Sequence, residues 1–118
     1  MQILLHADPN IDGGAAMSEH LNKVVIDALG RFGERVIRVE AHLSDQNGKT
    51  KSGDDDIRCL LEATLVGEPA IVVKAQSGNA HQAIAEALRK LKRAIGTAID
   101  KHDPQRQYAH EAAPEQST

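Results

Sequence analysis

The chain is 118 residues long, carries a net charge of −3 at pH 7, and is 41% hydrophobic but only 2% aromatic. This length accommodates one domain with an aliphatic core, and the low net charge argues against a nonspecific polycation for nucleic acid. A single cysteine, Cys59, excludes an intramolecular disulfide framework and a zinc site built from several cysteines. No signal peptide or membrane-length apolar run is recognisable, so we expect a cytoplasmic protein without membrane contact.

The N-terminal part of the chain predicts a strand followed by a helix. Residues Gln2–Ala7 form a short apolar run before a turn sequence, which predicts a brief strand. Apolar residues then recur at helical spacing over Ala15–Phe32, and Gly30 and Gly33 mark the end of this helix.

Three further strands are predicted in the middle of the chain. Residues Val36–Ser44 alternate strictly, which places Ile37 on the buried face and Val36 on the outer face. The charged segment Asp45–Asp56 predicts a long hairpin loop. Two more strands are expected on its C-terminal side, at Ile57–Val66 and at Ala70–Ala75.

The last predicted element is a long amphipathic helix. Ser77-Gly78-Asn79 opens it, and one apolar stripe continues from Ala80 to Ile99. We therefore predict one α+β domain over residues 1–102 with the order β-α-β-β-β-α, a four-stranded, mostly antiparallel sheet and both helices packed on one face. Residues 103–118 are polar without periodicity, which predicts a disordered tail.

Positive charge is concentrated in this last helix. Residues 79–102 contain five Lys or Arg and two Asp or Glu, whereas residues 1–78 contain eight and twelve. At 100° per residue, Arg89, Lys92 and Arg93 share an arc of about 100° opposite the apolar stripe. Such a row suits contact with nucleic-acid phosphates, and a scarcity of aromatic residues favours recognition by backbone and shape. A solvated helix face without a ligand is the competing interpretation.

The remaining candidates for chemistry are weak. The loop acids do not follow the calcium-loop pattern, because Gly48 is the fourth residue from Asp45 instead of the sixth. The six histidines match no metal-binding or catalytic motif, and Cys59 is expected to be buried. We therefore predict no catalytic residues, no metal site and no cofactor. A small enzyme or metal protein built around the acidic loop and His42 is the least favoured alternative.

The order of elements, the segment Arg31–Asp45 and the closing helix segment His81–Ile95 together resemble the ribosome hibernation-promoting factors. These are also called ribosome-associated inhibitors or sigma-54 modulation proteins. The resemblance covers residues 1–102 and implies a non-enzymatic factor that binds small-subunit ribosomal RNA and silences translation in stressed or resting cells. It does not imply a DNA partner.

Family positions carried onto this chain name the residues expected to contact ribosomal RNA. The basic part of the last helix is matched by Arg89, Lys92 and Arg93, and less closely by Lys90 and Lys101; around the first helix the expected contacts are Lys23, Arg31 and Arg35. The alternative is a protein-binding regulatory module that kept the fold and lost RNA binding. Its partner, or a second copy in a weak homodimer, would then use the half-apolar outer face of the sheet.

Overall fold

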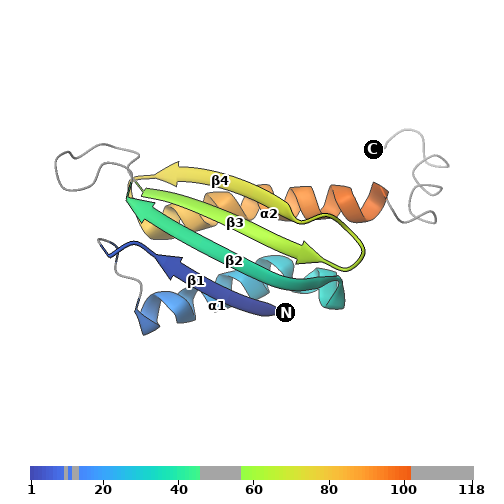
Figure 1. The fold of residues 1–118 in the computed structure, drawn as a ribbon, viewed down its shortest axis with the longest axis horizontal. Coiled ribbons are helices and arrows are strands. Elements are labelled where there is room, and N and C mark those ends of the chain that lie inside the picture. The colour runs from blue at the N-terminus through green and yellow to red at the C-terminus, as the bar shows by residue number, and fades with distance from the viewer. Residues whose placement is uncertain (10, 12–13, 46–56, 102–118) are drawn as a thin grey trace.

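A four-stranded sheet carries both helices of the protein on one of its faces (Figure 1). The computed structural model describes residues 1–9, 11, 14–45 and 57–101. In chain order the elements are β1 (Gln2–Ala7), α1 (Ala15–Leu29), the 3-10 helix η1 (Gly30–Arg35), β2 (Val36–Asp45), β3 (Ile57–Leu65), β4 (Ile71–Ser77) and α2 (Ala80–Lys101). The predicted α+β order is confirmed, with η1 added before β2.

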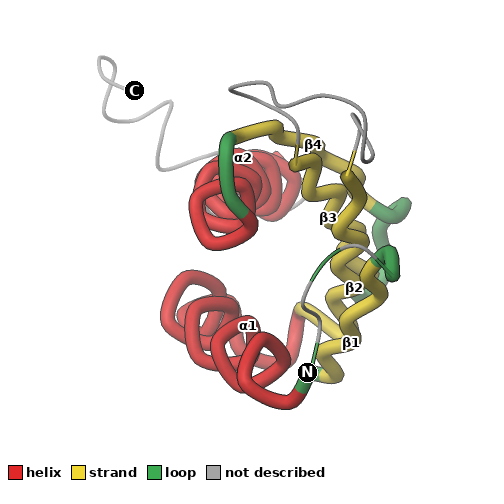
Figure 2. Tube along the Cα trace, turned by 90° about the vertical axis from the view of Figure 1, so that its left-hand side faces the viewer, coloured by secondary structure: helices red, strands yellow, loops and turns green. Residues whose placement is uncertain are grey.

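The sheet is mixed, and its strands follow one another in the order β1-β2-β3-β4. β1 pairs with β2 in parallel, whereas the β2–β3 and β3–β4 pairs are antiparallel. Parallel neighbours need a crossover connection, and α1 supplies it between β1 and β2. α1 and α2 lie on the same side of the sheet, as Figure 2 shows in the view along the layers.

The core is aliphatic and lies between the helices and the inner face of the sheet. Its largest fully buried side chains include Leu21 and Leu29 of α1, Leu61 of β3, and Leu91 and Ile95 of α2. Each of these side chains is less than 2% exposed. Because each Å² of apolar surface removed from water contributes about 25 cal/mol, their burial is the main contribution to the stability of the fold. The apolar stripe predicted for the last helix is the surface that α2 buries.

Both helices have ends that their local sequence explains. The Oδ1 atom of Asn79 accepts a hydrogen bond of 2.8 Å from the backbone N–H of Gln82, which caps the first turn of α2. α1 ends at Leu29, short of the predicted Phe32, and the chain continues as η1. Within η1, Gly33 has a φ of 60°, a backbone conformation that glycine adopts without strain.

One prediction for β2 is wrong. Val36 is 1% exposed and Ile37 is 49% exposed, so the two side chains face opposite to the expected directions. The pairing of β2 with β3 shifts between Val36 and Arg38, because a bulge there places an extra residue in β2. From Arg38 onward the predicted alternation holds, and Val39, Ala41 and Leu43 are buried.

The other boundaries differ by a few residues or lie outside the described part of the chain. β4 extends to Ser77, which is buried and was expected to open the last helix. The predicted loop Asp45–Asp56, apart from Asp45 itself, and the predicted tail 103–118 lie outside the described residues. Among the described residues, no helix has the length and apolar character needed to cross a bilayer.

Candidate nucleic-acid interface

The strongest concentration of positive charge lies on the solvent side of α2. Arg89, Lys92 and Arg93 are all exposed, while Leu91 and Ile95 on the opposite side of the helix are buried. This separation follows from the 3.6-residue period, which turns residues of the apolar stripe inward and leaves the intervening positions in solvent. The structure thus presents these three cations together on one accessible helix surface.

Two further cations predicted as contacts, Lys90 and Lys101, lie on the flank of α2 that faces β4. The Nζ atom of Lys90 donates a hydrogen bond of 2.7 Å to the backbone carbonyl of Lys74 in β4. A hollow of about 580 Å³ lies on this flank, lined by Lys90, Lys101 and Arg93 together with apolar side chains such as Ala94. Glu68 also lines this hollow, and most of the lining surface is apolar.

Arg31 reaches α2 from the opposite side, although it belongs to η1. Its Nη2 atom lies 3.8 Å from the position that a Cβ atom on Gly96 would occupy, which is an ordinary van der Waals distance, so the guanidinium group lies against this part of α2. The same guanidinium lies over the ring of Phe32, 4.8 Å from the ring centroid. Arg31 is therefore held beside α2, one helical turn beyond Lys92.

The remaining predicted contacts, Lys23 and Arg35, are exposed but belong to other parts of the molecule. Lys23 lies on α1, close enough to His20 to affect its protonation. Arg35 ends η1, where its backbone carbonyl accepts a hydrogen bond of 2.9 Å from the N–H of Val66. The eight predicted residues thus extend from α1 through η1 to α2, with five of them on α2.

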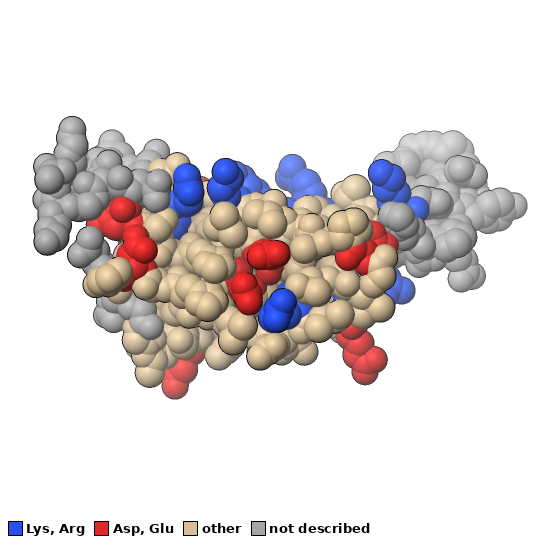
Figure 3. Space-filling view, in the orientation of Figure 1, with Lys and Arg blue, Asp and Glu red and all other residues tan. Residues whose placement is uncertain are grey.

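Charge differs between the two helices and the sheet. α2 has five Lys or Arg and two Asp or Glu, whereas α1 has one Lys and two acidic residues. Figure 3 views the molecule from the sheet side, where acidic and basic side chains are mixed and Lys and Arg line the upper rim. The site that results can neutralise phosphates along α2. Among the described residues, Phe32 is the one Phe, Tyr or Trp, and it is half-buried. The described surface therefore offers nucleic-acid bases almost no aromatic ring on which to stack.

The second turn of α1 meets the start of α2 through two histidines. The rings of His20 and His81 are 4.2 Å apart between centroids, at an angle of 56°. Burial lowers the pKa of His20, and the nearby His81 and Lys23 lower it further, because all three effects disfavour an additional positive charge. The sequence contained no pattern that would pair these two residues.

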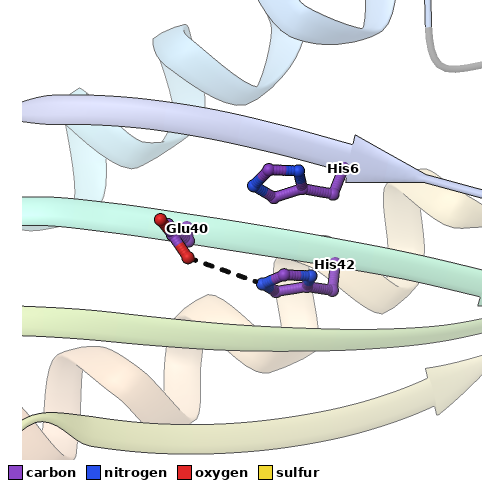
Figure 4. Close-up of side chains that lie close together, drawn as sticks. All are labelled: His6, Glu40 and His42. Carbon is purple, nitrogen blue, oxygen red and sulfur yellow. Dashed lines mark ion pairs between the residues drawn. The ribbon is translucent and has the colours of Figure 1, made fainter.

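The outer face of the sheet gathers a second group that the sequence analysis missed. His6 on β1 lies beside His42 on β2, and Glu40 lies next to His42 on the same strand (Figure 4). The Glu-x-His spacing of Glu40 and His42 was visible in the sequence, since alternate residues of a strand share a face. The contribution of His6 required the register of a parallel strand pair, which the sequence did not reveal.

Cys59 is completely buried in β3, as predicted. Burial raises the pKa of its thiol to about 12, because a low-polarity environment disfavours the thiolate. A nucleophilic or metal-binding role needs the thiolate, so Cys59 acts as a core residue.

Comparison with known proteins places this fold. The family model described as sigma 54 modulation protein / S30EA ribosomal protein matches residues 7–103, which confirms the resemblance found in the sequence. No curated protein matches the chain.

Solved structures with a similar fold include two with TM-scores of 0.64. The Protein Y N-terminal domain from Thermus thermophilus is 19% identical, and the match covers 80% of this chain and 96% of that one. A ribosomal subunit interface protein from Coxiella burnetii is 16% identical, with 83% and 97% covered. At these identities the likeness establishes the fold alone.

Proposed function

Because the chain belongs to the sigma 54 modulation protein / S30EA ribosomal protein family, we propose that it is a non-enzymatic cytoplasmic factor that binds the ribosome. Its partner is the RNA of the small subunit, and binding silences or modulates translation in stressed or resting cells. The name of one structural neighbour, a ribosomal subunit interface protein, is consistent with this proposal.

The observation that carries the proposal is the exposed row of Arg89, Lys92 and Arg93 on α2. Each of these side chains can neutralise one phosphate and release its condensed counterion. Lys90, Lys101 and Arg31 extend the row on its two sides, since they line the hollows that flank α2. Recognition by phosphate contact alone fits a surface with almost no aromatic side chains.

Sedimentation of the protein with purified ribosomes through sucrose gradients tests the proposal. With about three to five phosphate contacts, the logarithm of the binding constant should fall with the logarithm of the salt concentration with a slope of about −2 to −4. The protein should therefore sediment with small subunits at low salt and remain at the top of the gradient at high salt. Absence from the ribosomal fractions at low salt would refute the proposal.

A second function is supported by a different observation on the outer face of the sheet. Ile37 is 49% exposed and Val72 is 52% exposed, on β2 and β4 respectively. Exposed aliphatic side chains of this size suit contact with a protein partner or with a second copy in a weak homodimer. Sedimentation equilibrium at low and high salt separates the two functions, because a dimer held by apolar contacts persists at high salt whereas phosphate contacts are lost.

A further inference from the structure

His6, Glu40 and His42 form a compact group on the outer face of the sheet. Glu40 and His42 are two residues apart in β2, so their side chains project from the same face. The parallel register of β1 and β2 pairs His6 directly with His42. The three side chains therefore meet across the junction of the two strands, and in Figure 4 their polar ends lie close together.

The distances within this group are close to those of a metal site. One ligand atom from each residue can be chosen so that all three lie within 4.8 Å of one another. The Nε2 atom of His42 is 3.7 Å from Oε1 of Glu40, and the imidazole rings of His6 and His42 stack with centroids 4.7 Å apart. Bonds of about 2.0–2.2 Å around a tetrahedral ion place ligand atoms roughly 3.3–3.6 Å apart. Binding thus requires movements of about 1 Å.

The side chains are free to make such movements and accessible to an ion from solvent. The side chain of His42 is 45% exposed and that of Glu40 is 25% exposed, while His6 is exposed. Arg38 holds the second carboxylate oxygen of Glu40, with its Nε atom 3.7 Å from Oε2. The other carboxylate oxygen, Oε1, is then directed at His42. In metal sites, neighbouring side chains commonly orient a ligating carboxylate in this way.

We propose that His6, Glu40 and His42 bind a divalent ion of the late first-row transition metals, for which Zn²⁺ is the probe. Two imidazole nitrogens and one carboxylate oxygen suit zinc, nickel or copper, whereas calcium and magnesium require oxygen-rich sites. Water completes the coordination. No other group of three His, Cys, Asp or Glu side chains in the described part of the chain is close enough to bind a metal.

The position of the site implies a role in stability, independent of the function proposed above. The ion would connect β1, an edge strand of six residues, to its neighbour β2. In the unfolded chain His6 is far from Glu40 and His42 along the sequence, so the ion binds the folded state preferentially and raises the melting temperature. The site lies on the face opposite α2, so it does not overlap the candidate nucleic-acid interface.

Isothermal titration calorimetry of the metal-free full chain with Zn²⁺ measures the stoichiometry and affinity of binding, and thermal denaturation measures the change in melting temperature. Together these measurements test the inference. We expect one ion per chain and an increase in melting temperature with Zn²⁺ but not with Mg²⁺ or Ca²⁺. In Glu40→Gln and His42→Gln the affinity should fall at least tenfold. Both positions are solvent-accessible, so the variants should fold, and their circular dichroism spectra without metal verify this.

Two variants serve as matched controls. Glu62→Gln removes the same charge from the cross-strand partner of Glu40 on β3, and His81→Gln removes one histidine of the pair between the helices. Both should bind Zn²⁺ as the wild-type protein does. The inference is overturned by absence of binding, by unchanged affinity in His42→Gln, by an equal loss in Glu62→Gln, or by one ion per two chains, which would indicate a metal-bridged dimer.

Discussion

Replacing Arg89, Lys92 and Arg93 together by alanine should remove ribosome binding and leave the fold intact. All three side chains are exposed on α2 and point away from the buried stripe that includes Leu91. Surface substitutions of this kind change the free energy of unfolding by about 0.5 kcal/mol or less each. For a domain of this size, 0.5 kcal/mol corresponds to a change in melting temperature of about 2–4 °C, so three such changes of the same sign would shift it by at most about 6–12 °C. Folding and binding can therefore be measured separately in the same variant.

The expected loss of binding follows from the number of cations removed. A wild-type slope of about −2 to −4 corresponds to a loss of affinity of roughly 16- to 250-fold between about 50 and 200 mM salt. Each phosphate contact contributes close to one unit of slope, so the triple variant should retain a slope near −1 or shallower. Its residual binding should then change less than about tenfold over the same range of salt.

Cosedimentation with small subunits over a salt series provides the measurement, and a charge-matched variant provides the control. Arg38, Arg58 and Lys74 lie on the outer face of the sheet, and replacing them by alanine removes the same total charge. This control variant should bind with nearly the wild-type slope. Normal binding by the helix variant together with lost binding by the sheet variant would refute the assignment of the interface to α2.

Three further predictions concern stability and reactivity. Gly96→Ala should raise the free energy of unfolding, measured by denaturant titration, by about 0.5–1 kcal/mol, because alanine favours the helical conformation more than glycine does. The new methyl group would lie 3.8 Å from Arg31, an ordinary contact distance, so destabilisation would contradict this packing. Burial, together with the nearby His81 and Lys23, lowers the pKa of His20 below its ordinary value of 6.5 in the folded protein. The unfolded chain therefore binds a proton at His20 more tightly than the folded protein does, and the free energy of unfolding falls as the pH drops below 6.5. The decrease in melting temperature between pH 7.5 and 5.5 should therefore be smaller in His20→Gln, and an equal decrease would count against this explanation. Because burial raises the pKa of Cys59 to about 12, a thiol reagent at pH 8 should modify the native protein much more slowly than the urea-unfolded chain, and equal rates would show that the thiol is accessible.

The sequence alone determined the elements whose signal is local. The apolar stripe of α2 and the alternation in β2 from Arg38 onward depend only on spacing along the chain, and both were predicted correctly. The same spacing identified Arg89, Lys92 and Arg93 as one exposed surface, because residues on one helix keep fixed relative directions. The family resemblance rested on this order of elements as well, and the family match confirms it.

Only the tertiary structure decided the features that depend on how separate segments pair. Val36 and Ile37 lie on the faces opposite to those predicted, because a bulge in the pairing of β2 with β3 interrupts the alternation. The residue types at these positions do not indicate the bulge. The guanidinium group of Arg31 lies beside Gly96 of α2, although the two residues are 65 positions apart in the chain. His6 meets His42 through the parallel register of β1 and β2. Register is set by the fit of whole strands against the core, so single-residue patterns do not contain it.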